Sequence, residues 1–157
     1  MKTIVVFKST HHGNTRKVAE TIARVLDAEL VEAGELENPE ALGKADVLGF
    51  GSGVYFGKLH QEILSLIERL PPAGGKRAFF FSTSGTGPSL LNSYDSHMRK
   101  ILQEKGFEVA GGFSCRGYDT YGLLGIFGGI NRGRPNKEDL RKAEQFARDI
   151  LRKLKEY

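Results

Sequence analysis

The chain has 157 residues, the length of one domain, and its single cysteine, Cys115, excludes an internal disulfide framework and any site built from several cysteines. A formal net charge of +4 raises nucleic acid or an acidic protein as a partner. No run approaches the ~18 apolar residues of a membrane helix, and the N-terminal apolar run is too short for a signal peptide. We therefore expect a single domain over residues 1–157 that has no membrane span and resides in the cytoplasm.

Two kinds of apolar pattern alternate along the chain. Short β-branched or aromatic runs are typical of strands, and apolar residues three or four positions apart are typical of helices. In chain order the patterns predict strand 3–7, helix 15–27, strand 28–32, strand 46–50, helix 60–70, strand 77–81, helix 92–105, strand 107–113 and helix 136–154. Asn136 and Asp139 are placed to cap the last helix. This alternation predicts an α/β fold with a parallel sheet and helices on both faces, in which ligands bind at the carboxyl ends of the strands.

The loop after the first strand combines hydroxyl groups with a glycine and leads directly into a helix. A helix N-terminus presents free N–H groups and a positive dipole, which suit a phosphate group. A simple helix cap accounts for one hydroxyl and one glycine, but not for three hydroxyls. The loop is neither a P-loop nor a dinucleotide fingerprint, because the glycine patterns of both are absent. The candidate phosphate-binding residues are Ser9, Thr10, His11, His12, Gly13, Asn14 and Thr15.

The segment Thr10-His11-His12-Gly13-Asn14-Thr15 resembles the T-x-T-G-x-T phosphate loop of flavodoxins, with His12 in place of one hydroxyl residue. The five-strand layout also resembles the flavodoxin fold over the whole chain. The resemblance implies a doubly wound, five-stranded parallel sheet of order 2-1-3-4-5. It also implies FMN as the cofactor, with its 5′-phosphate in this loop.

The segment after the third strand carries two aromatic residues between glycines. The resemblance implies that it contacts the flavin, and stacking of an aromatic side chain on a flat ring contributes on the order of 1 kcal/mol beyond burial. We expect Tyr55 to be the residue that stacks on the flavin, and Phe56 is the second candidate. Packing of Phe56 beneath the loop is an equal alternative. The candidate residues are Gly53, Val54, Tyr55, Phe56 and Gly57.

The segment after the fourth strand is rich in hydroxyl groups and glycine, which together form a nest of small donors. The resemblance implies hydrogen bonds to the pyrimidine edge and the ribityl chain of FMN. An ordinary strand-to-helix turn has a similar composition, but the position at the carboxyl end of a central strand favours binding. The candidate residues are Ser82, Thr83, Ser84, Gly85, Thr86 and Gly87.

A long glycine-rich loop over 114–135 follows the fifth strand. Loops of about 20 residues in compact domains are usually functional. Its apolar residues either dock a partner or cover a substrate, or they pack on the edge of the sheet, and the sequence leaves these alternatives open. Cys115 is expected to be a small buried apolar residue rather than a nucleophile.

The chain departs from common electron-transfer flavodoxins in its charge. Those proteins are acidic and often stack a tryptophan on the flavin, whereas this chain is basic and has no tryptophan. Segment 82–93 contains no acidic residue. Carboxylates near the flavin disfavour the anionic, fully reduced cofactor, so we expect a higher potential for the second electron than in acidic flavodoxins.

The favoured function is electron transfer through bound FMN to a redox partner protein, for which the positive charge favours an acidic surface, or to a small acceptor. The alternative is an FMN-dependent oxidoreductase of the protoporphyrinogen dehydrogenase (menaquinone-linked) or quinone reductase type, on a short match over 53–60. A receiver domain is excluded because Phe7, Lys8 and Ser9 stand where its acidic pair would be. Nucleic acid is not expected, because the basic residues do not cluster with aromatic ones. We expect a monomer or a weak homodimer.

Overall fold

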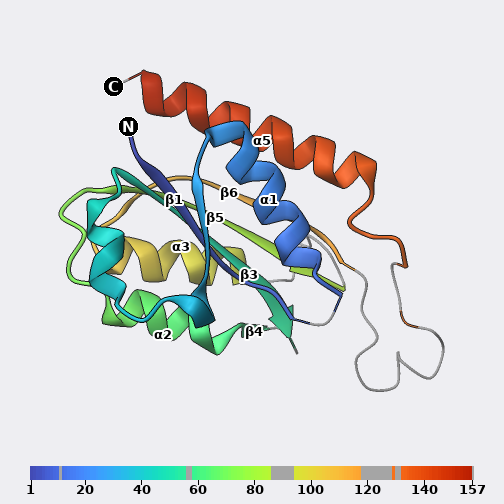
Figure 1. The fold of residues 1–157 in the computed structure, drawn as a ribbon, viewed down its shortest axis with the longest axis horizontal. Coiled ribbons are helices and arrows are strands. Elements are labelled where there is room, and N and C mark those ends of the chain that lie inside the picture. The colour runs from blue at the N-terminus through green and yellow to red at the C-terminus, as the bar shows by residue number, and fades with distance from the viewer. Residues whose placement is uncertain (11, 56–57, 86–93, 118–128, 130–131, 157) are drawn as a thin grey trace.

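The computed structural model describes residues 1–10, 12–55, 58–85, 94–117, 129 and 132–156. Within these residues, strands, helices and short 3-10 helices (η) alternate (Figure 1). Their order is β1 (Thr3–Lys8), α1 (Asn14–Leu26), β2 (Glu29–Glu32), η1 (Ala33–Glu35), η2 (Pro39–Lys44), β3 (Val47–Tyr55), β4 (Lys58–Leu59), α2 (Gln61–Arg69), β5 (Arg77–Ser84), α3 (Tyr94–Glu104), β6 (Glu108–Arg116) and α5 (Lys137–Lys155).

The sheet has the predicted topology. Its strands are ordered β2-β1-β3-β5-β6, and the neighbouring strands on this path are all parallel. Counting the five predicted strands in chain order, this is 2-1-3-4-5, so the expected fold class is confirmed. Helices α1 and α5 cover one face, and α2 and α3 cover the other (Figure 1).

Alternation along the central strands divides the core into two layers. In β1, Ile4 and Val6 face the α2/α3 layer, while Val5 and Phe7 face the α1/α5 layer. Such strands have no polar face, which explains their nearly continuous apolar sequences.

Two glycines in β3 make room for aromatic rings of the neighbouring strand. A Cβ atom on Gly49 would lie 2.4 Å from Cζ of Phe79, and one on Gly51 would lie 2.2 Å from Cζ of Phe81. The two residues of each pair are register partners in the parallel ladder of β3 and β5. The rings therefore lie across the central strand, where any larger side chain would collide with them.

The strands that lead to the candidate site extend further than predicted. The strand expected over 46–50 ends at Tyr55, that over 77–81 ends at Ser84, and that over 107–113 ends at Arg116. The prediction placed the strand ends where the apolar runs ended, but the polar residues that follow continue the ladder, as in the pairs Ser52↔Ser82 and Ser82↔Ser114.

Two corrections follow from these longer strands. Ser82, Thr83 and Ser84 lie in β5 rather than in a loop, and Cys115 lies in β6 rather than after it. The short strand β4 pairs antiparallel with β3 and was not predicted, because two residues are too few to give a pattern.

Helix α5 has the predicted cap. The side chain of Asn136 accepts a hydrogen bond from the N–H of Asp139, and the side chain of Asp139 accepts one from the N–H of Asn136. In this helix Ala143, Ala147, Ile150 and Leu154 are fully buried, and Leu140 and Leu151 are partly buried. No helix formed by the described residues is long and apolar enough to cross a membrane.

Candidate functional site

Helix α1 begins with an N-terminus that suits an anion. Its N-cap is Gly13, with φ of 67°, so the N-cap residue itself supplies no side-chain acceptor, and the first turn contains no acidic residue. One first-turn donor, the N–H of Arg16, is bound by Ser9 Oγ at 3.2 Å, and the Arg16 guanidinium is paired with Glu32. The other backbone N–H groups and the positive end of the helix dipole are the features that suit a phosphate dianion.

The structure places most of the predicted phosphate-binding residues at the carboxyl end of β1. Ser9 and Thr10 follow the strand directly, His12 is exposed, and Asn14 and Thr15 begin α1. His11 lies outside the described residues. Thr15 is buried, and its Oγ1 lies 2.9 Å from Oγ1 of Thr83. This bond joins the first candidate segment to the third.

The second segment begins on β3 and folds back as a hairpin. Gly53, Val54 and Tyr55 are the last residues of β3, and Val54 and Tyr55 pair with Leu59 and Lys58 of β4. Phe56 and Gly57 lie outside the described residues. The stacking of Tyr55 or Phe56 on a flavin ring stays a prediction.

The hairpin leads into α2 through His60. Its Nδ1 accepts a hydrogen bond from the N–H of Glu62 at 3.0 Å and so caps the helix. Burial lowers the pKa of His60, with a further lowering from Lys8 and an opposing effect of Glu62. The neutral imidazole is the form whose Nδ1 can accept this bond, so burial and capping favour the same state.

The third segment distributes its hydroxyl groups over both faces of the sheet. Thr83 faces α1 through its contact with Thr15, whereas the Ser84 hydroxyl lies 3.0 Å from the Tyr94 hydroxyl at the start of α3. Ser82 is 2% exposed, and its Oγ lies 2.6 Å from Oγ of Ser114. Gly85 follows β5, and Thr86 and Gly87 lie outside the described residues. Of these hydroxyl groups, those of Ser82 and Ser84 therefore bind within the protein on the α3 side.

Asp95 is an acidic residue of this region that the sequence analysis missed. Its Oδ1 accepts hydrogen bonds from Ser114 Oγ at 3.3 Å and from Ser82 Oγ at 3.5 Å. Burial raises the pKa of Asp95, and the two serine hydroxyls and Arg99 oppose that effect in part. The third candidate segment ended at Gly87, and Asp95 fell within the helix predicted over 92–105. Its place in the first turn of a helix, where carboxylates are favoured, was the available signal.

The end of β6 lies beside the first segment. A Cβ atom on Gly117 would lie 2.5 Å from Nδ2 of Asn14, and the Gly117 N–H donates to the carbonyl of Ser84 at 3.0 Å. Cys115 is buried as expected, and burial raises its pKa to about 12. A thiol with this pKa stays protonated at neutral pH, and burial of this kind is typical of structural cysteines.

The guanidinium of Arg134, which precedes α5, forms a two-point ion pair with the Asp139 carboxylate in the first turn of this helix. The apolar residues predicted to dock a partner or cover a substrate, Leu123, Leu124, Ile126, Phe127 and Ile130, lie outside the described residues. In the described part of the chain, no group of three or more His, Cys, Asp or Glu residues could hold a metal ion.

Together these contacts bring the ends of β1, β3, β5 and β6 to one edge of a doubly wound α/β sheet, with a helix N-terminus among them. This is the class of protein that binds a phosphorylated cofactor at the carboxyl ends of its strands.

Comparison with known proteins identifies the family. Residues 4–124 match the family model of a flavodoxin domain. An uncharacterized protein of Methanocaldococcus jannaschii is 42% identical over 152 residues, which cover 97% of this chain and 99% of that protein. The chain belongs to the flavodoxin family, whose members bind FMN and carry out redox reactions.

Solved structures agree with the fold. A flavodoxin of Streptococcus pneumoniae has a TM-score of 0.74 at 18% identity, covering 98% of this chain and 99% of that one. Flavodoxin 2 of Bacillus cereus has a TM-score of 0.72 at 22% identity, covering 98% and 99%. The rubredoxin oxygen:oxidoreductase of Desulfovibrio gigas has a TM-score of 0.73 at 14% identity, and the match covers 99% of this chain but 36% of that one.

Proposed function

We propose that this chain is an FMN-dependent electron carrier that passes electrons to a partner protein or a small acceptor. The observation that carries the proposal is the N-terminus of α1, which has a glycine N-cap, no acidic residue in its first turn and a bond from Thr15 to Thr83 of the third segment. These features fit the 5′-phosphate of FMN.

Three segments would hold the cofactor. Residues 9–15 would bind the phosphate through backbone N–H groups and hydroxyls, and residues 53–57 and 82–87 would contact the flavin ring. When bound, FMN supplies the capacity to accept and release electrons one or two at a time. The protein binds and orients the ring and sets the charge around it.

A matched pair of substitutions at Gly13 tests the phosphate site. Asparagine and aspartate have nearly the same shape and both tolerate a left-handed backbone, and a Cβ atom on Gly13 meets nothing within 4 Å. Only Gly13→Asp places a carboxylate where the phosphate would lie. We expect Gly13→Asp to bind FMN at least about tenfold more weakly than Gly13→Asn, which corresponds to about 1.4 kcal/mol.

The binding constants are measured by titrating apoprotein with FMN and following flavin fluorescence. Riboflavin, which lacks the phosphate, is the control ligand, and both variants should bind it equally. Purified protein that stays colourless and binds no added FMN would overturn the proposal. Equal FMN affinities for the two variants would mean that the phosphate does not bind at the N-terminus of α1.

The carrier is preferred to the enzymatic alternative because that alternative rests on a short sequence match over 53–60. The two functions separate in one assay. An enzyme of the protoporphyrinogen dehydrogenase or quinone reductase type would turn over protoporphyrinogen with a quinone, or reduce a quinone catalytically. A carrier would exchange electrons with a protein partner and show no such turnover.

A further inference from the structure

A row of polar side chains crosses the sheet at the level where the second and third candidate segments begin. Lys8, Ser52, Ser82 and Ser114 are successive register partners in β1, β3, β5 and β6. Each binds a group near the start of α2 or α3. Lys8 Nζ lies 3.3 Å from Glu62 Oε2, while Ser82 and Ser114 bind the Asp95 carboxylate.

Ser52 has a special position in this row, because its hydroxyl contacts both ends of the second segment. Its Oγ accepts a hydrogen bond from the N–H of His60 at 2.8 Å and donates one to the carbonyl of Gly53 at 2.7 Å. Ser52 is 0% exposed. One buried hydroxyl therefore holds the chain where it leaves the sheet and where it returns to it.

The β3 strand is paired on both sides only as far as Ser52. Its pairing with β5 reaches Gly53, opposite Thr83, but its pairing with β1 ends at Ser52, opposite Lys8, and its pairing with β4 involves only Val54 and Tyr55. At His60 the chain turns into α2, so the His60 N–H is no longer part of a strand pair. The Ser52 hydroxyl supplies its acceptor and closes the hairpin.

We propose that Ser52 is a positioning residue for the hairpin of residues 53–59, which contacts the flavin ring in the function proposed above. The inference rests on that function. Ser52 fixes the Gly53 carbonyl and His60, the residue before α2. The backbone of the described hairpin residues, 53–55 and 58–59, therefore depends on this base for its position.

The test compares Ser52→Ala with Ser82→Ala. Both variants remove a buried serine hydroxyl at the same level of neighbouring strands, but only Ser52 contacts the hairpin. In apoprotein, Ser52→Ala should raise the amide hydrogen-exchange rate of His60 at least about tenfold beyond any change in global unfolding. Ser82→Ala should leave that rate at the global value.

The second readout is flavin binding. Ser52→Ala should weaken the binding of FMN and the binding of riboflavin by the same factor, about three- to tenfold, because the contact with the flavin ring changes and the contact with the phosphate does not. This separates it from Gly13→Asp, which acts on FMN alone. Should Ser52→Ala fail to fold, Ser52→Cys keeps the size with a weak donor and is measured in the same way.

An unchanged amide hydrogen-exchange rate of His60 in Ser52→Ala would show that the Ser52 hydroxyl does not hold the base of the hairpin, whether or not FMN binds. Faster exchange with unchanged flavin affinity would overturn the positioning role. A wild-type protein that binds no flavin would overturn the proposed function and this role with it, while the exchange data would still report on the hydroxyl contacts.

Discussion

The lack of a side chain at Gly49 determines how the central strands β3 and β5 pack. The ring of Phe79 lies where its Cβ atom would be, at 2.4 Å, and Phe79 is fully buried. A buried ring cannot move away without displacing its neighbours, since interiors are packed as densely as organic crystals. The glycine is therefore required by shape rather than by backbone conformation.

We expect Gly49→Ala to lower the free energy of unfolding by about 1–3 kcal/mol, the usual cost of overpacking a core. Urea denaturation followed by circular dichroism measures the change. Gly43→Ala is the matched control, because a Cβ atom on Gly43 meets nothing within 4 Å and the same loss of chain entropy in the unfolded state applies to both variants. An unchanged free energy of unfolding in Gly49→Ala would mean that the Phe79 ring can adopt another position without cost.

Residue contacts also explain which site residues the sequence could predict. Ser9, Thr10 and Thr15 could be proposed as phosphate-binding residues from the sequence, because hydroxyls next to a glycine at a helix start form a local pattern. Asp95 could not, because its contacts with Ser82 and Ser114 join residues that are far apart in the sequence. The role of Ser52 at the base of a hairpin depends in the same way on the path of the folded chain.

At the start of α5, one residue, Asp139, takes part both in the helix cap and in an ion pair with a residue outside the helix. Asp139 is 3% exposed, caps the helix through Asn136 and forms the ion pair with Arg134. Burial alone would raise the pKa of Asp139, but the hydrogen bonds from Arg134 and from the Asn136 N–H outweigh it, and the pKa is lowered. The pair ties the end of the segment that follows β6 to the first turn of α5.

Asp139→Asn keeps a side chain of the same shape and removes the charge. We expect a loss of about 1–3 kcal/mol in the free energy of unfolding at pH 7, the range for hydrogen bonds to charged groups. A lowered pKa in the folded state means that this stability is present above the unfolded-state value of about 3.9 and is lost as pH falls through the folded-state value. The difference between wild type and variant should therefore shrink in acid.

Urea denaturation at pH 7 and at lower pH values measures this difference. Glu138→Gln is the control, since Glu138 is exposed and pairs with Arg141 on the surface of the same helix. We expect no measurable change from that variant. A gap between wild type and Asp139→Asn that stays constant into acid would contradict the role of the carboxylate charge.

The element order could be predicted from the sequence because each central strand and helix has its own apolar period. The ends of β3, β5 and β6 could not, because serine and threonine are typical of loops until a neighbouring strand is known to supply partners. Residues 33–44 gave no element pattern, and the structure has the 3-10 helices η1 and η2 there. Both failures concern short or polar segments whose conformation depends on tertiary contacts.

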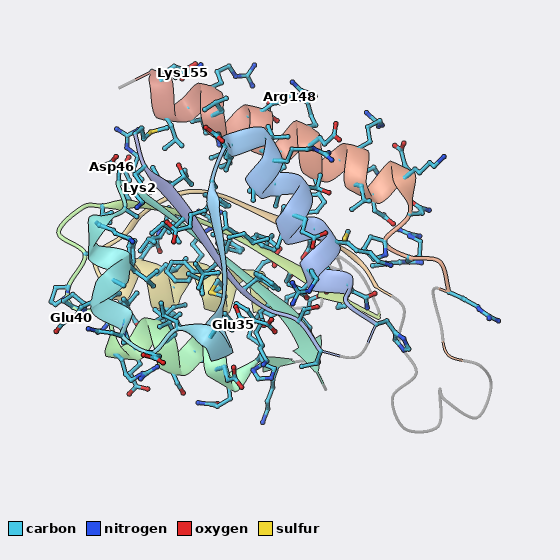
Figure 2. The ribbon with its side chains drawn as sticks, viewed as in Figure 1. Lys2, Glu35, Glu40, Asp46, Arg148 and Lys155 are labelled. Carbon is cyan, nitrogen blue, oxygen red and sulfur yellow. The ribbon has the colours of Figure 1, made fainter. Side chains whose placement is uncertain are left out.

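Across the whole molecule, the net charge of +4 is unevenly distributed. Residues 27–46 contain seven acidic residues and one basic residue, whereas α5 contains seven basic and four acidic residues. Glu35 and Glu40 lie on the side of the 3-10 helices, and Arg148 and Lys155 lie on the outer side of α5 (Figure 2). Glu35 follows the carboxyl end of β2 directly, whereas Asp46 precedes β3 and lies at the opposite edge of the sheet, where it accepts a hydrogen bond from the N–H of Lys2.

At the carboxyl edge most carboxylates are paired with cations. Glu32 is paired with Arg16 at 2.7 Å, and Glu62 with Lys8 at 3.3 Å. Asp95 is bound instead by two neutral hydroxyls, with Arg99 acting on it only as a nearby charge. Among the described residues at the ends of β5 and β6, its charge is the one that would oppose a reduced, anionic flavin in the proposed site.

We therefore expect Asp95→Asn to raise the potential for addition of the second electron to bound FMN. A Coulomb interaction on the order of 1 kcal/mol corresponds to a shift of roughly 45 mV for one electron. Glu40→Gln removes the same charge from η2 and should leave the potential nearly unchanged. Redox titration of the three FMN-loaded proteins at pH 7 measures the shifts.

The pH dependence of that shift identifies its cause. Because burial raises the pKa of Asp95, the wild-type carboxyl group becomes neutral at a higher pH than an ordinary aspartate, and the advantage of Asp95→Asn should fade as the solution is acidified. The wild-type potential itself should lie above that of flavodoxins whose FMN is surrounded by carboxylates. A potential shift of Asp95→Asn that is the same at pH 7 and in acid would mean that altered packing at α3, and not the loss of charge, causes the shift. A wild-type potential as low as in acidic flavodoxins would show that the positive net charge does not affect the flavin.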